Sequence, residues 1–232
     1  MLKKSLLLSA ACLLVSAAVA HANTIAYTAA GTDTDGHVSA SAIITTGSNS
    51  LTVILSSLQV NPTADGQELS GILITLGSAP TSNGGFTSET GNLINISGSG
   101  VATADTIDTI THWGTGLSGS TVCLETVSSP GGCAPGGKPI DLIIGSGSFT
   151  NANPSITKRN PQIDGTGTFA ITLNGVTSLT TVTGVQFEFG TSGNTFFDGT
   201  VSTSPVPEPS SLLLLGSGII SAAGLIRRRF IA

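Results

Sequence analysis

Charged and aromatic side chains are scarce in this chain of 232 residues. Only 9% of the residues are charged and 4% are aromatic, with one Trp and one Tyr in total. Average soluble proteins carry about 25% charged residues, many of them on the exposed faces of helices. The low charge argues against an ordinary helical cytosolic enzyme. The lack of aromatic rings argues against a polysaccharide-cleaving groove, because such grooves need rings on which sugars stack.

Basic residues are especially rare between the two ends of the chain. Three basic and twelve acidic residues lie between residues 23 and 204, a formal charge of −9 against −5 for the whole chain. Nucleic-acid binding is therefore disfavoured, because too few basic residues are available to displace counterions from phosphates. Binding to an anionic membrane surface is disfavoured for the same reason.

Small and β-branched residues dominate what remains. The chain has 30 Gly, 30 Ser and 32 Thr, a composition that suits short strands joined by tight turns. Apolar and polar residues alternate in several segments, and no long segment between the two ends has a helical period. We expect an all-β domain over residues 23–198, a β-sandwich or jelly roll, followed by a linker over 199–206. The expected strands are 38–44, 51–55, 69–76, 93–96, 120–124, 140–144, 168–173 and 180–189. Predicted turns include Asp35-Gly36, Asn83-Gly84-Gly85, Asp164-Gly165 and Asn174-Gly175.

The beginning of the chain has the three parts of a secretory signal. Lys3 and Lys4 form a basic start, residues 5–19 form an apolar run, and small residues flank His21. We expect residues 1–22 to be a signal peptide that forms a helix and is removed on export.

The other end of the chain has a second tripartite pattern. Pro207, Glu208 and Pro209 precede an apolar stretch over residues 210–226, which ends in Arg227, Arg228 and Arg229. As a helix this stretch would be roughly 25 Å long, the short limit for crossing a bilayer. Positive residues stay on the cytoplasmic side, so we expect one C-terminal transmembrane helix with the β domain outside.

Residues 207–232 resemble a PEP-CTERM sorting signal, on the strength of this order of motif, helix and Arg cluster at the extreme end of the chain. The resemblance implies a bacterial envelope protein whose tail is recognised and removed by an exosortase, a membrane-embedded transpeptidase-like enzyme. It also implies delivery to the cell surface or the extracellular matrix, often in bacteria that make exopolysaccharide.

Two cysteines remain after removal of the signal peptide, Cys123 and Cys133. An oxidising envelope compartment favours a disulfide between them. Closing this short loop should stabilise the fold by about 2.5–3 kcal/mol. A metal or redox pair is disfavoured, because the spacing is not C-x-x-C and no His lies nearby in the sequence.

Catalytic and metal-binding patterns are weak. The sequence has no G-x-S-x-G motif, and we interpret His37 and His112 as structural. Asp33-Thr34-Asp35-Gly36 is similar to the start of a Ca²⁺ loop but lacks the later ligands, so a turn is the better interpretation. We therefore expect no catalytic residue, no cofactor and no metal.

Two functions stay open at this point. The first is a non-enzymatic surface or matrix protein, processed by an exosortase and associated with exopolysaccharide. The alternative is a secreted carbohydrate-binding module or weak glycan hydrolase, with Asp105, Asp108 and His112 beside Trp113 as its site. A solvent-facing Trp113 in a groove would favour the alternative, and a buried Trp113 would count against it.

Overall fold

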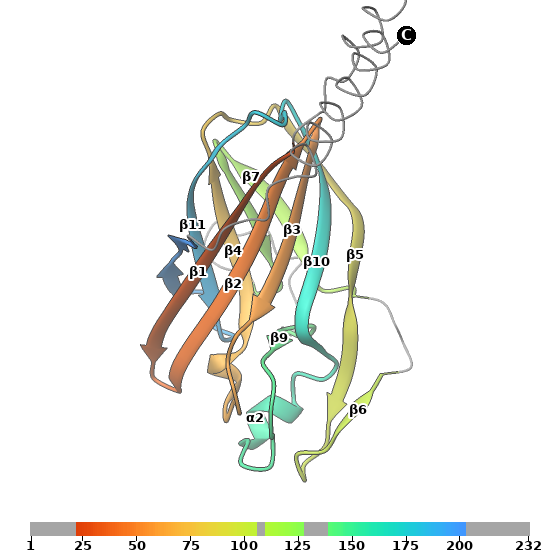
Figure 1. Cartoon of the computed structure of the whole chain (residues 1–232). Helices are drawn as coiled ribbons and strands as arrows, with labels where there is room; N and C mark the ends of the chain where they lie inside the picture. The colour runs from red at the N-terminus through yellow and green to blue at the C-terminus, as the bar shows by residue number, and fades with distance from the viewer. Residues whose placement is uncertain (1–21, 106–109, 128–138, 203–232) are drawn as a thin grey trace, which may run out of the picture. The chain divides into compact units, whose positions relative to one another are not determined.

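The computed structural model describes residues 22–105, 110–127 and 139–202 (Figure 1). The chain divides after Ser202 into two units, and all described residues belong to the first. The strands are β1 (Asn23–Asp33), β2 (Gly36–Gly47), β3 (Ser50–Ser57), β4 (Leu69–Leu76), β5 (Ser82–Ile96), β6 (Ala102–Ala104), β7 (Gly114–Ser118), β8 (Thr121–Glu125), β9 (Ile143–Ile144), β10 (Gln162–Asn174), β11 (Val182–Phe189), β12 (Thr195–Asp198) and β13 (Thr200–Val201).

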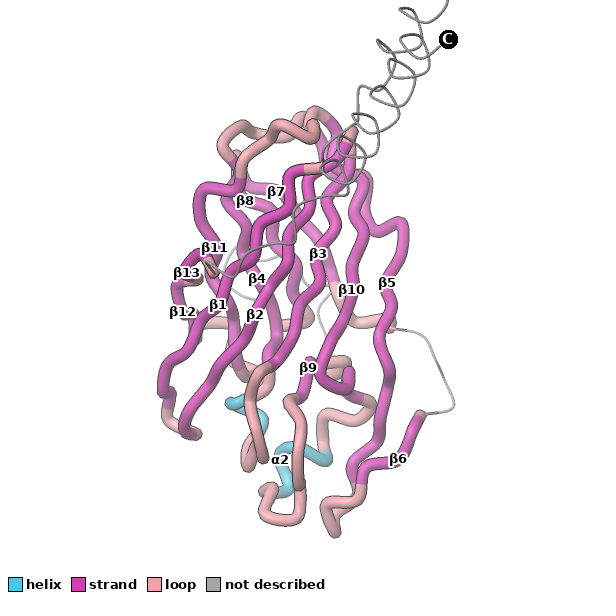
Figure 2. The backbone as a smooth tube through the Cα atoms, in the orientation of Figure 1, coloured by secondary structure: helices cyan, strands magenta, loops and turns pink. Residues whose placement is uncertain are grey.

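Helical structure within these ranges is confined to two short segments, η1 (Asp65–Gln67) and α2 (Pro154–Thr157), near one end of the strands (Figure 2). The Asn153 side chain caps α2 by accepting a hydrogen bond from the Ser155 N–H at 2.7 Å. Pro154 opens the helix, where its missing N–H costs nothing.

One layer of the fold contains β1, β2, β3, β10 and β5, all paired antiparallel. β1 and β2 form a long hairpin in which Asp33 lies opposite Gly36, and the tight turn uses the positive φ of Gly36. The β2–β3 hairpin turns at Asn49, which also has a positive φ. These turns occur where Asp-Gly and Asn-Ser interrupt the alternating pattern, as turn chemistry requires.

The other layer is built around β4, which pairs with β11 on one side and β8 on the other. β7 continues this layer beyond β8, and β12 continues it beyond β11. β9 joins the two layers, because it pairs in parallel with β10 and through Leu69 with β4.

The last two strands, β12 and β13, also connect the two layers. β12 pairs with β11, and β13 follows it at once and pairs with β1. Gly199 separates the two strands, packed against Val185 and Phe187. The described strands therefore form one mixed sheet that is folded over into two layers, as the curved strands of Figure 1 show.

The main core lies between the layers. Alternate residues of β2, β3, β4, β10 and β11 face inward and are fully buried, among them Ile44, Val53, Ile74, Phe169 and Phe187. Each such side chain contributes roughly 1.5–3 kcal/mol by burial. A second, smaller cluster packs under α2 and contains Ile94, Ile96, Ile144, Phe149 and Ile156.

The prediction of an all-β fold is confirmed for the described residues. The segment 69–76 coincides with β4, whereas only Ile143 and Ile144 of the expected strand 140–144 are extended. β1 and β7 were not predicted. The predicted turns Asn83-Gly84-Gly85 and Asp164-Gly165 are wrong, because both segments lie inside strands, next to register shifts that accommodate glycine.

Two predictions concern the ends of the domain. β13 lies within the stretch 199–206 that we predicted as a linker, so the sheet extends past residue 198. The signal helix and the C-terminal transmembrane helix fall outside the described residues and stay predictions.

Candidate functional site

Trp113 is buried in the core. Only 4% of it is exposed, and its ring packs on Phe169 with the centroids 4.5 Å apart. Its indole N–H donates a hydrogen bond of 2.8 Å to the backbone oxygen of Asp141. A buried indole needs such a partner, which fixes the ring in place. Trp113 is therefore no platform on which a sugar could stack.

Asp141 organises the chain around Trp113. It is 1% exposed and has a φ of 58°, in the left-handed region that Asp tolerates better than most residues. One carboxylate oxygen, Oδ2, accepts hydrogen bonds from the backbone N–H groups of Thr111 at 2.9 Å and His112 at 3.1 Å. These charge-assisted bonds anchor the segment before Trp113 to the loop before β9.

The imidazole of His112 contacts the same carboxylate. Its Nδ1 lies 3.2 Å from Asp141 Oδ2 and 2.8 Å from the hydroxyl oxygen of Thr111. A catalytic triad needs the nucleophile and the carboxylate on opposite ring nitrogens, so that the proton can be passed between them. Here both groups meet Nδ1, and the pattern is that of a side chain held in place by a loop.

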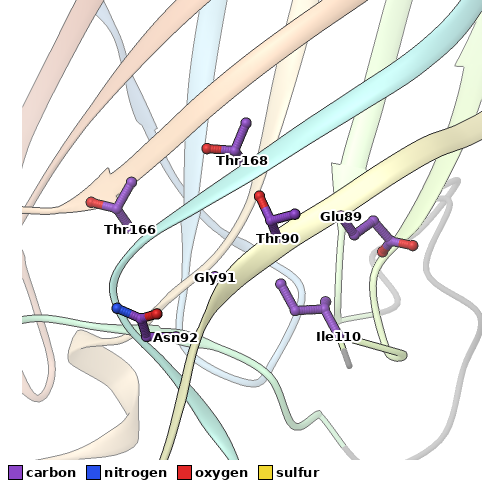
Figure 3. Close-up of a pocket in the computed structure, with 7 residues that line it drawn as sticks. All are labelled: Glu89, Thr90, Gly91, Asn92, Ile110, Thr166 and Thr168. Carbon is purple, nitrogen blue, oxygen red and sulfur yellow. The ribbon is translucent and has the colours of Figure 1, made fainter. Parts of the chain in front are cut away.

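A surface cavity of about 380 Å³ lies where β5 and β10 separate. Between the pairs Ile163–Leu93 and Gly167–Gly91, β10 has three residues where β5 has one, and this bulge opens the strands. The lining residues are Glu89, Thr90, Gly91, Asn92, Ile110, Thr166 and Thr168 (Figure 3). The described lining is mostly hydroxyl and amide groups, together with the large apolar side chain of Ile110.

Glu89 gives the cavity a carboxyl group. Burial raises the pKa of Glu89, and the negative charge of Asp141 raises it further. Figure 3 shows Glu89 and Ile110 on the other side of β5 from Thr166 and Thr168. The cavity therefore offers hydrogen-bond donors and acceptors. Among the described residues that line it, no second carboxyl group lies opposite the first, as glycoside hydrolysis would require.

The structure describes Asp105, His112 and Trp113 of the alternative site that the sequence suggested. His112 pairs with Asp141, a residue that sequence reasoning did not single out, and Asp108 lies outside the described residues. The N–H of Asp105 bonds to the Leu93 oxygen. Asp33 and Asp35 form the turn we predicted, with the Asp35 N–H donating to the Asp33 carboxylate. Across the described ranges, no three His, Cys, Asp or Glu residues come together as metal ligands do.

Comparison with known protein families finds a match at the end of the chain. Residues 205–229 match the PEP-CTERM protein-sorting motif. The chain carries a PEP-CTERM sorting signal. The matched range includes Pro207, Glu208 and Pro209, the apolar stretch and Arg227, Arg228 and Arg229, which are the three parts singled out in the sequence.

The PEP-CTERM signal indicates an exported protein that an exosortase processes. The signal lies outside the residues that the structure describes. Within those residues, no helix has the length and apolar character needed to cross a membrane. Searches among curated proteins and among solved structures found no match to this chain.

Cys123 lies in β8 opposite Leu73 of β4 and is 9% exposed. Cys133 lies outside the described residues, so the disulfide between these cysteines stays a prediction.

Proposed function

We propose that this PEP-CTERM protein is a non-enzymatic component of the cell surface or extracellular matrix. In this proposal an exosortase removes the tail after the membrane helix has held the precursor in the inner membrane, and the β domain is released. The PEP-CTERM match carries the proposal. Trp113 is buried, and Thr111 and Asp141 both contact Nδ1 of His112. Both observations support a structural role for Trp113 and His112.

The sorting step is tested by replacing Pro207, Glu208 and Pro209 together with Ala. We expect the variant to stay in the membrane fraction at precursor size, whereas Ser210→Ala beside the motif should be processed normally. Mass spectrometry of the envelope and medium fractions reads the size of each product. Unchanged processing and release of the triple variant would contradict the proposal.

The outer face of the first layer supports an association with neutral exopolysaccharide. Its cross-strand rows contain no charged residue over four strands; they are Thr24–Thr45–Thr52–Ala170, Ala26–Ile43–Ile54–Thr168 and Thr28–Ser41–Ser56–Thr166. Hydroxyl groups bond across the strands, Thr24 to Thr45 at 3.0 Å and Ser56 to Thr166 at 2.8 Å. A neutral polymer rich in hydroxyl groups can contact this face without removing water from a charge, which is the costly step in burying polar groups.

Charge placed on this face should weaken the association. Ile54 is 36% exposed at the middle of the face, and Leu179 is 86% exposed in the turn between β10 and β11. We expect Ile54→Glu to reduce co-sedimentation with exopolysaccharide purified from the producing cells, and Leu179→Glu to leave it unchanged. Equal sedimentation of both variants and the wild type would remove this face from the proposal.

The cavity between β5 and β10 favours a second candidate function, hydrogen-bonded binding of a small sugar by a secreted carbohydrate-binding module. Its hydroxyl and amide groups can pair with sugar hydroxyls, and its volume is at the small end of ligand sites, which span about 300–1,000 Å³. Glycan-array binding that is lost in Thr168→Val and kept in Thr200→Val, a change of the same kind on β13, would favour this candidate. No binding by the wild-type domain would reject it.

A further inference from the structure

Two glutamates lie on either side of a glycine in the second layer. In the antiparallel register, Gly71 of β4 lies opposite Glu188 of β11 and also opposite Glu125 of β8. Residues that are directly opposite in antiparallel strands place their side chains on the same face. Glu188 and Glu125 therefore project from the same face of the sheet, one on each side of a residue without a side chain.

The missing side chain of Gly71 leaves room for the side chains of both glutamates. A Cβ atom on Gly71 would lie 2.6 Å from Glu188 Oε2 and 2.8 Å from Glu125 Cγ. Both glutamates are 0% exposed, and neither carboxyl oxygen of Glu188 has a hydrogen-bond partner. A buried ionised carboxylate without a donor, next to a second carboxylate, is an arrangement that folded proteins avoid.

The surroundings of Glu188 include no basic group among the described residues that pair with it. Its neighbour on β12 is Phe196, and Asp198 lies one row away opposite Gln186. Leu73 and Cys123 lie in the same row as Gln186 and Asp198, which is the next row on this face of the sheet. A proton bound to Glu188 would remove the negative charge of its carboxylate and give the buried carboxyl group a hydrogen-bond donor.

We propose that Glu125 and Glu188 hold one proton between them at neutral pH, and that this shared proton fastens β8 and β11 across β4. The pair is then a pH-sensitive latch built into the second layer. While the proton is present, one carboxyl donates and the other accepts. When the proton is lost, two buried negative charges repel each other across Gly71, and the layer is weakened at this row.

The direction of the pH dependence follows from the environment of Glu188. Burial first, and then the charge of Glu125, raise the pKa of Glu188 from its usual 4.5 to about 8. When the pKa of a carboxyl group is higher in the folded state, its protonation stabilises the fold. This stabilisation is complete at pH values below the unfolded-state pKa and is lost as pH rises through the folded-state pKa. The latch should therefore hold in acidic and neutral surroundings and release in alkaline ones.

The proposal is tested by a titration of the side-chain carboxyl of Glu188 by carbon-13 NMR on the exported domain. We expect this carboxyl to stay protonated at neutral pH and to titrate near pH 8. The equilibrium constant for unfolding should rise by up to about 10³-fold between acidic and alkaline solution. Glu188→Gln, which keeps the shape and cannot ionise, should remove most of this rise.

Two further variants keep the proposal open to failure. Glu125→Gln should lower the pKa of Glu188, because it removes the neighbouring charge. Asp198→Asn, an exposed acid on β12, should leave the titration of Glu188 unchanged. An ionised Glu188 at neutral pH would overturn the proposal. So would alkaline stability that depends on added Ca²⁺ and is lost with a chelator, because a metal ion and not a proton would then hold the pair.

Discussion

At the scale of single residues, Asp141 shows how a buried charge can hold a loop in place. Its carboxylate accepts the N–H groups of Thr111 and His112, while its backbone oxygen accepts the Trp113 indole. Its own N–H bonds to the Pro161 oxygen. One residue thus connects three parts of the chain, and it does so in a left-handed conformation that costs less for Asp than for most residues.

Substitutions of Asp141 should separate its charge from its backbone conformation. Asp141→Asn keeps an acceptor and a residue that tolerates a positive φ, so we expect a loss of about 1–2 kcal/mol in the free energy of unfolding. Asp141→Ala leaves the two N–H groups without an acceptor and adds strain, and its cost should be about 3 kcal/mol or more. Urea denaturation measures both. Equal costs would show that the acceptor and the positive φ contribute little.

The predicted disulfide is a second question at this scale. We expect Cys123→Ser and Cys133→Ser each to lower the free energy of unfolding by about 2.5–3 kcal/mol, because each removes the same covalent loop. The double variant should cost no more than either single one. Titration of the exported, unreduced protein with a thiol reagent gives a direct check, and two reactive thiols would contradict the prediction.

At the scale of elements, β4 supports the second layer because both of its edges are paired. Its neighbours β11 and β8 present Phe187 and Leu124 to the core in the same row as Ile72. The row beside it presents Glu188 and Glu125 on the opposite face. Glycine at position 71 leaves room for both side chains, because a Cβ atom there would overlap them. The strand thus combines core packing on one face with a buried acidic pair on the other.

Gly71→Ala is expected to destabilise the fold by about 1–3 kcal/mol, because the new methyl group would overlap both glutamate side chains. Gly184→Ala on β11 is the matched control. There the nearest atom is Thr75 Cβ at 3.9 Å, an ordinary contact, so we expect no loss or a small gain in stability. Thermal unfolding of both variants compares them, and similar melting temperatures would mean that the second layer can shift to accept a methyl group at Gly71.

At the scale of the whole molecule, the domain combines a negative net charge with several buried acids. Glu68 is 0% exposed, and neither of its carboxyl oxygens has a hydrogen-bond partner. Burial and then the charge of Asp65 raise the pKa of Glu68, while the charge of Arg159 lowers it by less. Arg159 is already engaged, since its Nε and one terminal nitrogen contact Asp65 at 2.9 Å.

The domain should therefore lose stability as pH rises, since the raised pKa of Glu68 favours a protonated group in the fold. This contribution is complete below the unfolded-state pKa and is lost as pH passes the higher folded-state pKa. We expect Glu68→Gln to reduce the decline seen in the wild type, measured by chemical denaturation at several pH values. A decline equal to that of the wild type would show that Glu68 is ionised in the fold.

Strands of the fold and the sorting signal could be predicted from the sequence, because they depend on residues that are close together in the chain. The alternation in residues 38–44 and 51–55 predicted β2 and β3, because a half-buried strand needs apolar residues at every second position. The order of Pro207–Pro209, the apolar stretch and the Arg cluster predicted the sorting signal, which the family comparison confirmed. Both patterns are properties of consecutive residues.

The tertiary structure decided what depends on residues far apart in the chain. Gly71, Glu125 and Glu188 are separated by more than fifty residues from one to the next, and only strand pairing brings them into one row. The same is true of Asp141 and His112, and of the bulge that opens the cavity between β5 and β10. A side chain's own neighbours along the sequence set its strand and its face. Its charge state and its partners are set by the register between strands, which only the folded chain determines.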